Sequence, residues 1–274
     1  MIRAHVLLLT CLASGFLLPP ASAVAQTMRA EDVVELRELP GWRMDNGNHM
    51  AGLEITLAPG WKTYWRVPGE AGIPPRIFLT ASGKVTGAAI HWPTPDIFTD
   101  HGIRTVGYTG RVVLPLELSL RRNQSDIPLR GEIEIGVCRE ICLPVTLSIA
   151  TELPMAGGKS DGAIRAALRN RPVEAARAGL SSVICRIRPT ADGLSVTATL
   201  AMPPLGRDEV VVFELPDKSI WVAEATAERS GGILVAQTEF TAVDGKPFPV
   251  ARSDIHITVL ADGRGAQIQG CDGG

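Results

Sequence analysis

Apolar and polar residues alternate along several segments of the chain, and this alternation limits the possible folds more than any other feature. The segment 111–120 carries an apolar residue at every second position: Val112, Leu114, Leu116 and Leu118. A period of two is typical of a half-buried β-strand. The segments 49–57, 194–202 and 253–261 alternate in the same way. Pro115 cannot donate to a strand ladder, so it predicts an edge strand or a β-bulge in the first of these segments.

Two regions show this strand pattern, at about residues 28–152 and 181–272, and glycine and proline interrupt both at short intervals. Short strands with frequent turns predict antiparallel sandwiches. The segment 156–180 between them differs, because Asp161 or Ser160 can cap a helix there. The apolar stripe of that helix would be formed by Ala163, Ile164, Ala167 and Leu168. We therefore expect two β-sandwich domains joined by a short helical linker.

The first 25 residues have the layout of a cleavable secretory signal peptide. Arg3 supplies a positive charge, residues 6–18 are apolar, and small residues end the segment at Ala23 and Ala25. No later stretch approaches the length of a membrane span, so we expect none in the mature chain. Removal of Arg3 leaves 26 basic and 29 acidic residues, a net charge of −3. This balance argues against nucleic acid or anionic lipid as a partner.

Four cysteines remain after the predicted signal peptide: Cys138, Cys142, Cys185 and Cys271. An even number in an exported protein favours disulfides. Sequence proximity favours a bond between Cys138 and Cys142, which leaves Cys185 and Cys271 as a candidate structural disulfide. That second pair brackets the whole second β region.

The residues around Cys138 and Cys142 predict a hairpin. A fully extended chain would separate the two Cα atoms by about 13 Å, whereas a disulfide requires less than about 7 Å. The chain must therefore reverse over residues 139–141, and a three-residue hairpin loop does this. By the alternation of the flanking residues, both cysteines are expected on the solvent face.

Three roles for this pair stay open from its spacing alone. It can be a small structural disulfide, a metal clamp or a redox-active pair. The nearest histidines, His91 and His101, lie more than 35 residues away, so we predict no metal site. The charges of Arg139 and Glu140 oppose each other in their effect on a thiolate, and they do not decide between the other two roles.

Four segments of the chain resemble the periplasmic N-terminal region of the DsbD/ScsB family of thiol:disulfide interchange proteins. They are "GWKTYWRVPGEAGIPP" (60–75), "IHWPTPDIF" (90–98), "GYTGRVVLPL" (107–116) and "GVCREICLPV" (136–145). The three-residue gap between the cysteines is more similar to the ScsB branch. The resemblance implies an all-β fold with two immunoglobulin-like β-sandwich domains.

The resemblance also implies a function and its residues. Cys138 and Cys142 would be the redox pair, with Cys142 forming the mixed disulfide and Cys138 resolving it. A cap loop would shield them, and the matching stretch is 96–108, with Phe98 or Tyr108 as the cover and His101 beside it. No cofactor is expected, because the cysteines themselves carry the two electrons.

The expected location is the periplasm, and the expected partners are periplasmic disulfide proteins with a thioredoxin fold. Because this sequence carries neither the membrane domain nor the thioredoxin-like domain of full-length family members, it is expected to be a stand-alone module or to depend on a separate membrane electron donor. Two other functions remain open. One is a non-catalytic periplasmic adaptor with a structural disulfide, and the other is a copper-handling protein, since thiolates suit Cu(I).

Overall fold

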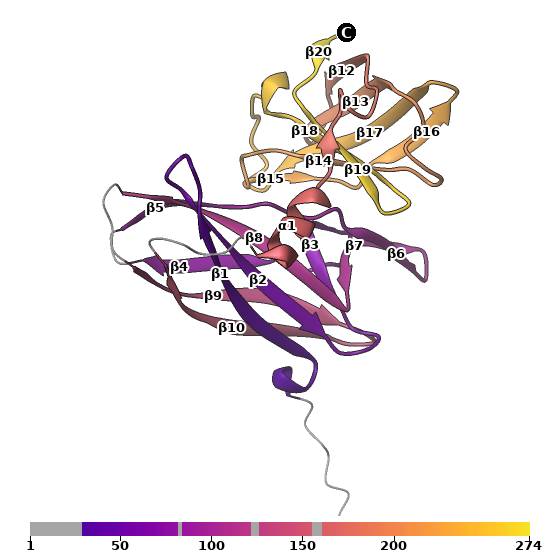
Figure 1. Ribbon diagram of the computed structural model, residues 1–274. Coiled ribbons are helices and arrows are strands. Elements are labelled where there is room, and N and C mark those ends of the chain that lie inside the picture. The colour runs from indigo at the N-terminus through magenta and orange to yellow at the C-terminus, as the bar shows by residue number, and fades with distance from the viewer. Residues whose placement is uncertain (1–28, 82–83, 122–125, 155–160) are drawn as a thin grey trace, which may run out of the picture.

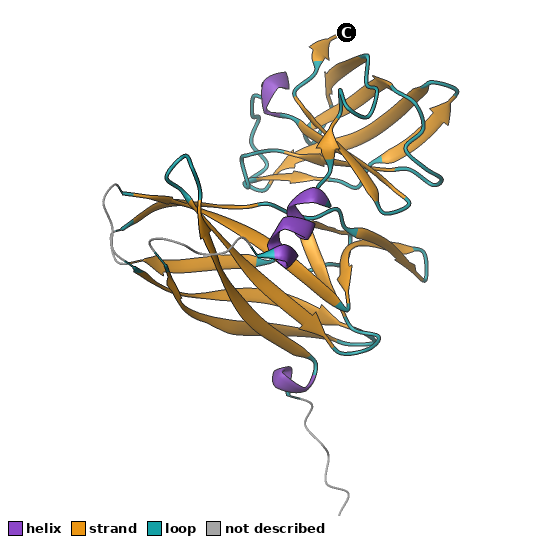
Figure 2. Cartoon of the chain, viewed as in Figure 1, coloured by secondary structure: helices purple, strands orange, loops and turns teal. Residues whose placement is uncertain are grey.

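The computed structural model describes residues 29–81, 84–121, 126–154 and 161–274. The predicted signal peptide (1–25) and Ser160 lie outside the described residues. Strands form nearly all the regular structure (Figure 2). Within the described ranges, no helix has the length and apolar character needed to cross a bilayer. The predicted all-β, immunoglobulin-like fold class is confirmed.

Among the residues that the structure describes, the first sandwich contains ten strands, arranged in two sheets (Figure 1). They are β1 (Val34–Arg43), β2 (His49–Leu57), β3 (Lys62–Gly69), β4 (Arg76–Ala81), β5 (Val85–Ile90), β6 (Asp96–Asp100), β7 (Ile103–Thr109), β8 (Arg111–Leu120), β9 (Ile127–Cys138) and β10 (Cys142–Leu153), preceded by a short 3-10 helix, η1 (Ala30–Asp32). One sheet has the order β1-β2-β8-β5, and the other has the order β10-β9-β3-β7-β6, with β4 paired to β9. Their inner faces enclose a core that includes Trp65, Leu118 and Ile133.

The second sandwich follows a helix, α1 (Gly162–Arg169). Its elements are β11 (Val173–Glu174), β12 (Ser182–Pro189), β13 (Leu194–Ala201), β14 (Val210–Glu214), β15 (Ile220–Val222), β16 (Thr226–Ser230), β17 (Ile233–Ala242), a 3-10 helix η2 (Arg252–Asp254), β18 (His256–Ala261), β19 (Arg264–Gln269) and β20 (Asp272–Gly273). The sheets have the orders β11-β19-β18-β14 and β15-β17-β13-β12-β20, with β16 paired to β17. Phe213 and Phe240 pack edge to face in the core between them.

Strand β8 lies between β2 and β5, so the prediction that Pro115 marks an edge strand was wrong. The carbonyl oxygen of Pro115 accepts a hydrogen bond from the main-chain nitrogen of His91 at 2.9 Å. The nitrogen of Pro115 faces the same neighbour, because N–H and C=O of one residue point to the same side of a strand. Strand β5 ends at Ile90, so the missing donor falls at the end of a ladder.

The segment predicted as a helical linker is divided between the two sandwiches. The carboxylate of Asp161 caps α1 and accepts hydrogen bonds from the main-chain nitrogens of Ala163 and Ile164. Ile164 is fully buried against Gly52 and Leu39 of the first sandwich. Strand β11 instead pairs in parallel with β19 of the second sandwich. The helix is therefore packed onto a domain, and the two domains follow each other closely.

Strand β14 belongs to both hydrophobic cores. Val210 and Val212 pack with the core of the first sandwich. Val211 and Phe213, which point to the opposite face, pack with the core of the second. A strand shared in this way fixes how the two sandwiches are placed against each other.

His49 is buried in the first sandwich, and we expect it to make stability depend on pH. Its Nε2 lies 2.6 Å from the carbonyl oxygen of Pro40. Burial lowers the pKa of His49, the Pro40 hydrogen bond opposes this, and Arg43 adds to the lowering. In the unfolded state the pKa of His49 is about 6.5, so the unfolded chain binds a proton there as the pH falls below this value. The folded protein binds that proton only at a lower pH, because its His49 pKa is lower. In that window one such histidine reduces the free energy of unfolding by up to about 1.4 kcal/mol per pH unit.

Urea denaturation of wild type and His49→Gln at pH 7.5 and 5.5 checks this prediction. The loss of stability on acidification should be smaller in His49→Gln, since glutamine keeps a donor for Pro40 and does not titrate. His256→Gln, which alters an exposed histidine, is the matched control and should behave like wild type. An unchanged loss in His49→Gln would contradict the prediction.

Candidate functional site

Cys138 and Cys142 close the hairpin of β9 and β10, as the sequence predicts. The two strands pair continuously from Ile127 opposite Leu153 to Cys138 opposite Cys142. The main-chain nitrogen of Arg139 donates to the carbonyl oxygen of Ile141 at 3.0 Å within the three-residue loop. A disulfide joins the cysteines, whose Cα atoms are 4.1 Å apart.

The two cysteines differ in exposure, and the prediction that both lie open to solvent was wrong. Cys142 is exposed, but Cys138 is only 1% exposed. The alternation of apolar and polar residues assigns Cys138 to the correct face of the sheet. It does not predict which other segments cover that face. Ile73, from the segment before β4, packs on Gly136, where an added Cβ would come within 2.7 Å of the Ile73 Cβ. Gly136 shares the face of Cys138 two residues away, so this end of β9 is covered.

Two side chains of β3 lie beside the disulfide. The hydroxyl of Tyr64 is 3.7 Å from the Sγ of Cys142. Lys62 is directly opposite Cys138 in the register of β3 and β9, which places their Cβ atoms about 5 Å apart. Both residues lie in the segment 60–75 that carries the family resemblance, but the sequence alone did not identify either as a site residue.

Lys62 also connects the disulfide face to the hairpin formed by β6 and β7. Its ammonium group donates to the carboxylate of Asp100 at 2.6 Å and to the hydroxyl of Thr105 at 3.2 Å. The same group lies 5.2 Å from the centre of the Phe98 ring, within the range of a cation–π contact. The hairpin is therefore attached at the position opposite Cys138.

Burial and the charge of Asp100 both favour the protonated form of the Tyr64 hydroxyl. The hydrogen bond and the charge of Lys62 hold the pKa of Asp100 below its ordinary value. Burial, and then the negative charge of Asp100, raise the pKa of Tyr64. At neutral pH, Tyr64 thus presents an O–H donor toward the Cys142 sulfur, and an O–H donor stabilises a thiolate more than a disulfide sulfur.

The three residues proposed for the cap do not lie together. Phe98 is half-buried on β6 beside Lys62, and His101 is exposed in the turn between β6 and β7. Tyr108 was assigned wrongly, because its side chain is in the core and its hydroxyl donates to the carbonyl oxygen of Pro93 at 2.9 Å. It pairs with Thr63, which pairs with Val137, so Tyr108 lies on the face of the sheet opposite Cys138.

The second disulfide joins Cys185 on β12 to Cys271 near the end of the chain, with the Cα atoms 5.7 Å apart. Cys185 is fully buried in the core of the second sandwich. Among the described residues, no group of three or more His, Cys, Asp or Glu side chains is arranged to hold a metal ion.

Comparisons with known proteins found one matching family model and similar solved structures. Residues 31–154 match the family model described as "Thiol:disulfide interchange protein DsbD, N-terminal". The crystal structure of the N-terminal periplasmic domain of ScsB from Proteus mirabilis is similar, with a TM-score of 0.67 and 26% sequence identity over 90% of this chain and 96% of that chain. The curated proteins contain no match. Residues 31–154, which carry both Cys138 and Cys142, therefore form an N-terminal domain of the DsbD/ScsB family of thiol:disulfide interchange proteins.

Proposed function

We propose that this protein exchanges two electrons with partner proteins in the periplasm through Cys138 and Cys142. The observation that carries the proposal is the difference in exposure between the two bonded sulfurs. Thiol–disulfide exchange needs one sulfur that an incoming thiolate can reach. Cys142 is exposed and Cys138 is buried, so the partner has one point of attack.

In the oxidised protein, a thiolate of a reduced partner attacks the Cys142 sulfur, and the bond to Cys138 breaks. The electron pair of that bond goes to Cys138, which leaves as a thiolate and takes up a proton. A second thiolate of the partner then attacks the partner's own sulfur in the mixed disulfide, and Cys142 is released. The partner loses two electrons, and the Cys138–Cys142 pair gains them.

In the opposite direction the Cys142 thiolate attacks a disulfide of a client, and the Cys138 thiolate resolves the mixed disulfide. The Tyr64 hydroxyl, 3.7 Å from the Cys142 sulfur, stabilises the thiolate form of Cys142 in both directions. The family supports thioredoxin-fold proteins as clients and a membrane protein as the electron donor, and residues 1–25 would direct the chain to the periplasm.

Trapping of partners tests this function. Cys138→Ala leaves Cys142 able to form a mixed disulfide that nothing within the protein resolves. In a periplasmic extract of the source organism, this variant should collect adducts that disappear on reduction and contain thioredoxin-fold proteins. Cys142→Ala is the matched control and should collect none.

A structural role for the Cys138–Cys142 disulfide predicts a different result. Cys138→Ala and Cys142→Ala would then form mixed-disulfide adducts in equal amounts. The reduction potential of the pair would also lie below about −300 mV, as in structural disulfides of exported proteins. Either result would contradict the proposed exchange.

A further inference from the structure

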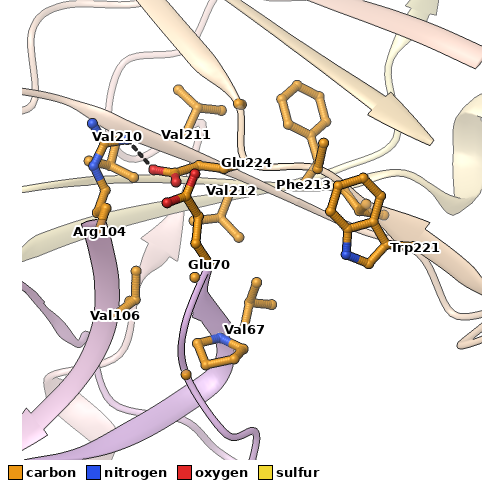
Figure 3. Close-up of a pocket in the computed structure, with 16 residues that line it drawn as sticks. Val67, Glu70, Arg104, Val106, Val210, Val211, Val212, Phe213, Trp221 and Glu224 are labelled. Atoms are coloured by element: carbon orange, nitrogen blue, oxygen red, sulfur yellow. Dashed lines mark hydrogen bonds and ion pairs between the residues drawn. The ribbon is translucent and has the colours of Figure 1, made fainter. Parts of the chain in front are cut away.

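Two segments that contact neighbours of Cys138 also approach the second sandwich. One is the β6–β7 hairpin, which holds Lys62 through Asp100 and Thr105. The other is the segment 69–75, whose Ile73 packs on Gly136. Both border a cleft of about 680 Å³ between the two sandwiches, lined on the far side by Val212, Phe213 and Trp221 (Figure 3).

A charged pair spans this cleft. The guanidinium of Arg104 on β7 donates to the carboxylate of Glu224, in the loop between β15 and β16. The carboxylate of Glu70 lies beside that of Glu224 (Figure 3). Burial raises the pKa of Glu224, the positive charge of Arg104 opposes the rise, and Glu70 adds to it. The second sandwich thus contacts the hairpin through Arg104 and the segment 69–75 through Glu70.

These contacts continue directly to the disulfide. Arg104 precedes Thr105, whose hydroxyl accepts from Lys62, and Lys62 is opposite Cys138. The main-chain nitrogen of Glu70 donates to the carbonyl oxygen of Arg104 at 3.3 Å. The two backbones approach closely here, because a Cβ at Gly69 would come within 2.6 Å of that same oxygen. A displacement of Arg104 would therefore move both segments together.

We propose that Arg104 and Glu224 are positioning residues that keep the Cys138 sulfur covered, so that the second sandwich directs a partner to Cys142. The proposal rests on the proposed exchange function, and it gives the second sandwich a role in that exchange. With Arg104 held, the hairpin keeps Lys62 opposite Cys138 and the segment 69–75 stays packed on Gly136, so one sulfur is open to attack. With Arg104 released, both segments loosen and the second sulfur becomes reachable.

The experiment measures the cover on Cys138 without any partner protein. In the Cys142→Ala background, Cys138 is a lone thiol, and its rate of alkylation by iodoacetamide reports how often it is uncovered. Adding Glu224→Gln should raise this rate about tenfold. The double charge exchange Arg104→Glu with Glu224→Arg should return it toward the slow rate, which a general loss of packing would not do.

The chain offers a matched control in a second ion pair between the sandwiches. Arg66 and Glu214 form a bidentate contact, with nitrogen–oxygen distances of 2.9 and 2.8 Å. Arg66 lies on β3, and among the described residues neither side chain hydrogen-bonds to the β6–β7 hairpin. Glu214→Gln in the same background should leave the alkylation rate of Cys138 nearly unchanged.

Three outcomes would overturn the proposal: no change in Glu224→Gln, an equal rise in Glu214→Gln, or no recovery in the charge exchange. Thermal melting of each variant separates a local effect from unfolding. If a variant unfolds, Arg104→Lys, which keeps the charge and shortens the reach, replaces it and should give a smaller rise. A failure of partner trapping in Cys138→Ala would contradict the exchange function and leave these alkylation rates as they are, so the two failures are distinguishable.

Discussion

Replacing both Cys185 and Cys271 with alanine will lower the free energy of unfolding by about 5 kcal/mol. The disulfide closes a loop across a sequence separation of 86 residues, and a loop of that length reduces the entropy of the unfolded chain by the equivalent of about 4.6 kcal/mol. Cys185 is also fully buried, so its truncation removes packing in the core. For a domain of this size such a loss lowers the melting temperature by more than about 10 °C.

The matched control removes the other disulfide. Cys138→Ala with Cys142→Ala opens a loop of only five residues, which gives about 2 kcal/mol in the same treatment, and the hairpin ladder already closes that loop. Calorimetry should therefore show a large fall in melting temperature for the first double variant and a small fall for the second. Equal falls would contradict the assignment of a structural role to Cys185–Cys271 alone.

The hairpin that carries the cysteines could be predicted because every constraint on it is local. The alternation of β9 and β10, the three-residue gap and the reach of a disulfide all lie between residues 127 and 153. The cover on this end of β9 could not be predicted, because Ile73, which packs on Gly136, is 63 positions away from it in the sequence. Sequence periodicity assigns a residue to a face of a sheet, and the chain that later covers that face is a tertiary feature.

The wrong assignment of Tyr108 had a local signal that could have corrected it. His101 and Gly102 form a two-residue turn with φ values of 52° and 83°, the conformation favoured in tight hairpins. Such a turn pairs Phe98 with Thr105, and Tyr108 then falls on the opposite face from Phe98. The register of the hairpin, taken from the turn, would have left Phe98 as the candidate cover and moved Tyr108 into the core.

The contacts between the sandwiches were beyond sequence reasoning for another reason. Arg104 and Glu224 are 120 positions apart, and nothing in either segment identifies the other as its partner. The helix α1 was recognised from its cap and stripe, but its packing on Gly52 and Leu39 was not. Local chemistry predicted the elements, and only the assembled fold shows which elements share a surface.

The lone thiol of Cys138 in Cys142→Ala will react with iodoacetamide at least about 100-fold more slowly than the lone thiol of Cys142 in Cys138→Ala. Alkylation requires an accessible thiolate. Cys142 is exposed, with the Tyr64 hydroxyl beside it as a donor. Cys138 is 1% exposed, so it reacts only when its cover opens, and an opening that costs about 3 kcal/mol slows the reaction by about 100-fold.

The comparison of the two variants contains its own control. In a concentration of urea that unfolds both, the two thiols stand in similar extended chains and should react at rates within about threefold of each other. A large ratio that persists in urea would trace to the neighbouring residues in sequence, Arg139 and Glu140, and not to burial. Equal rates in the native proteins would remove the basis for a single point of attack, because a partner could then bond to either sulfur and the order of events in the exchange would no longer follow from the fold.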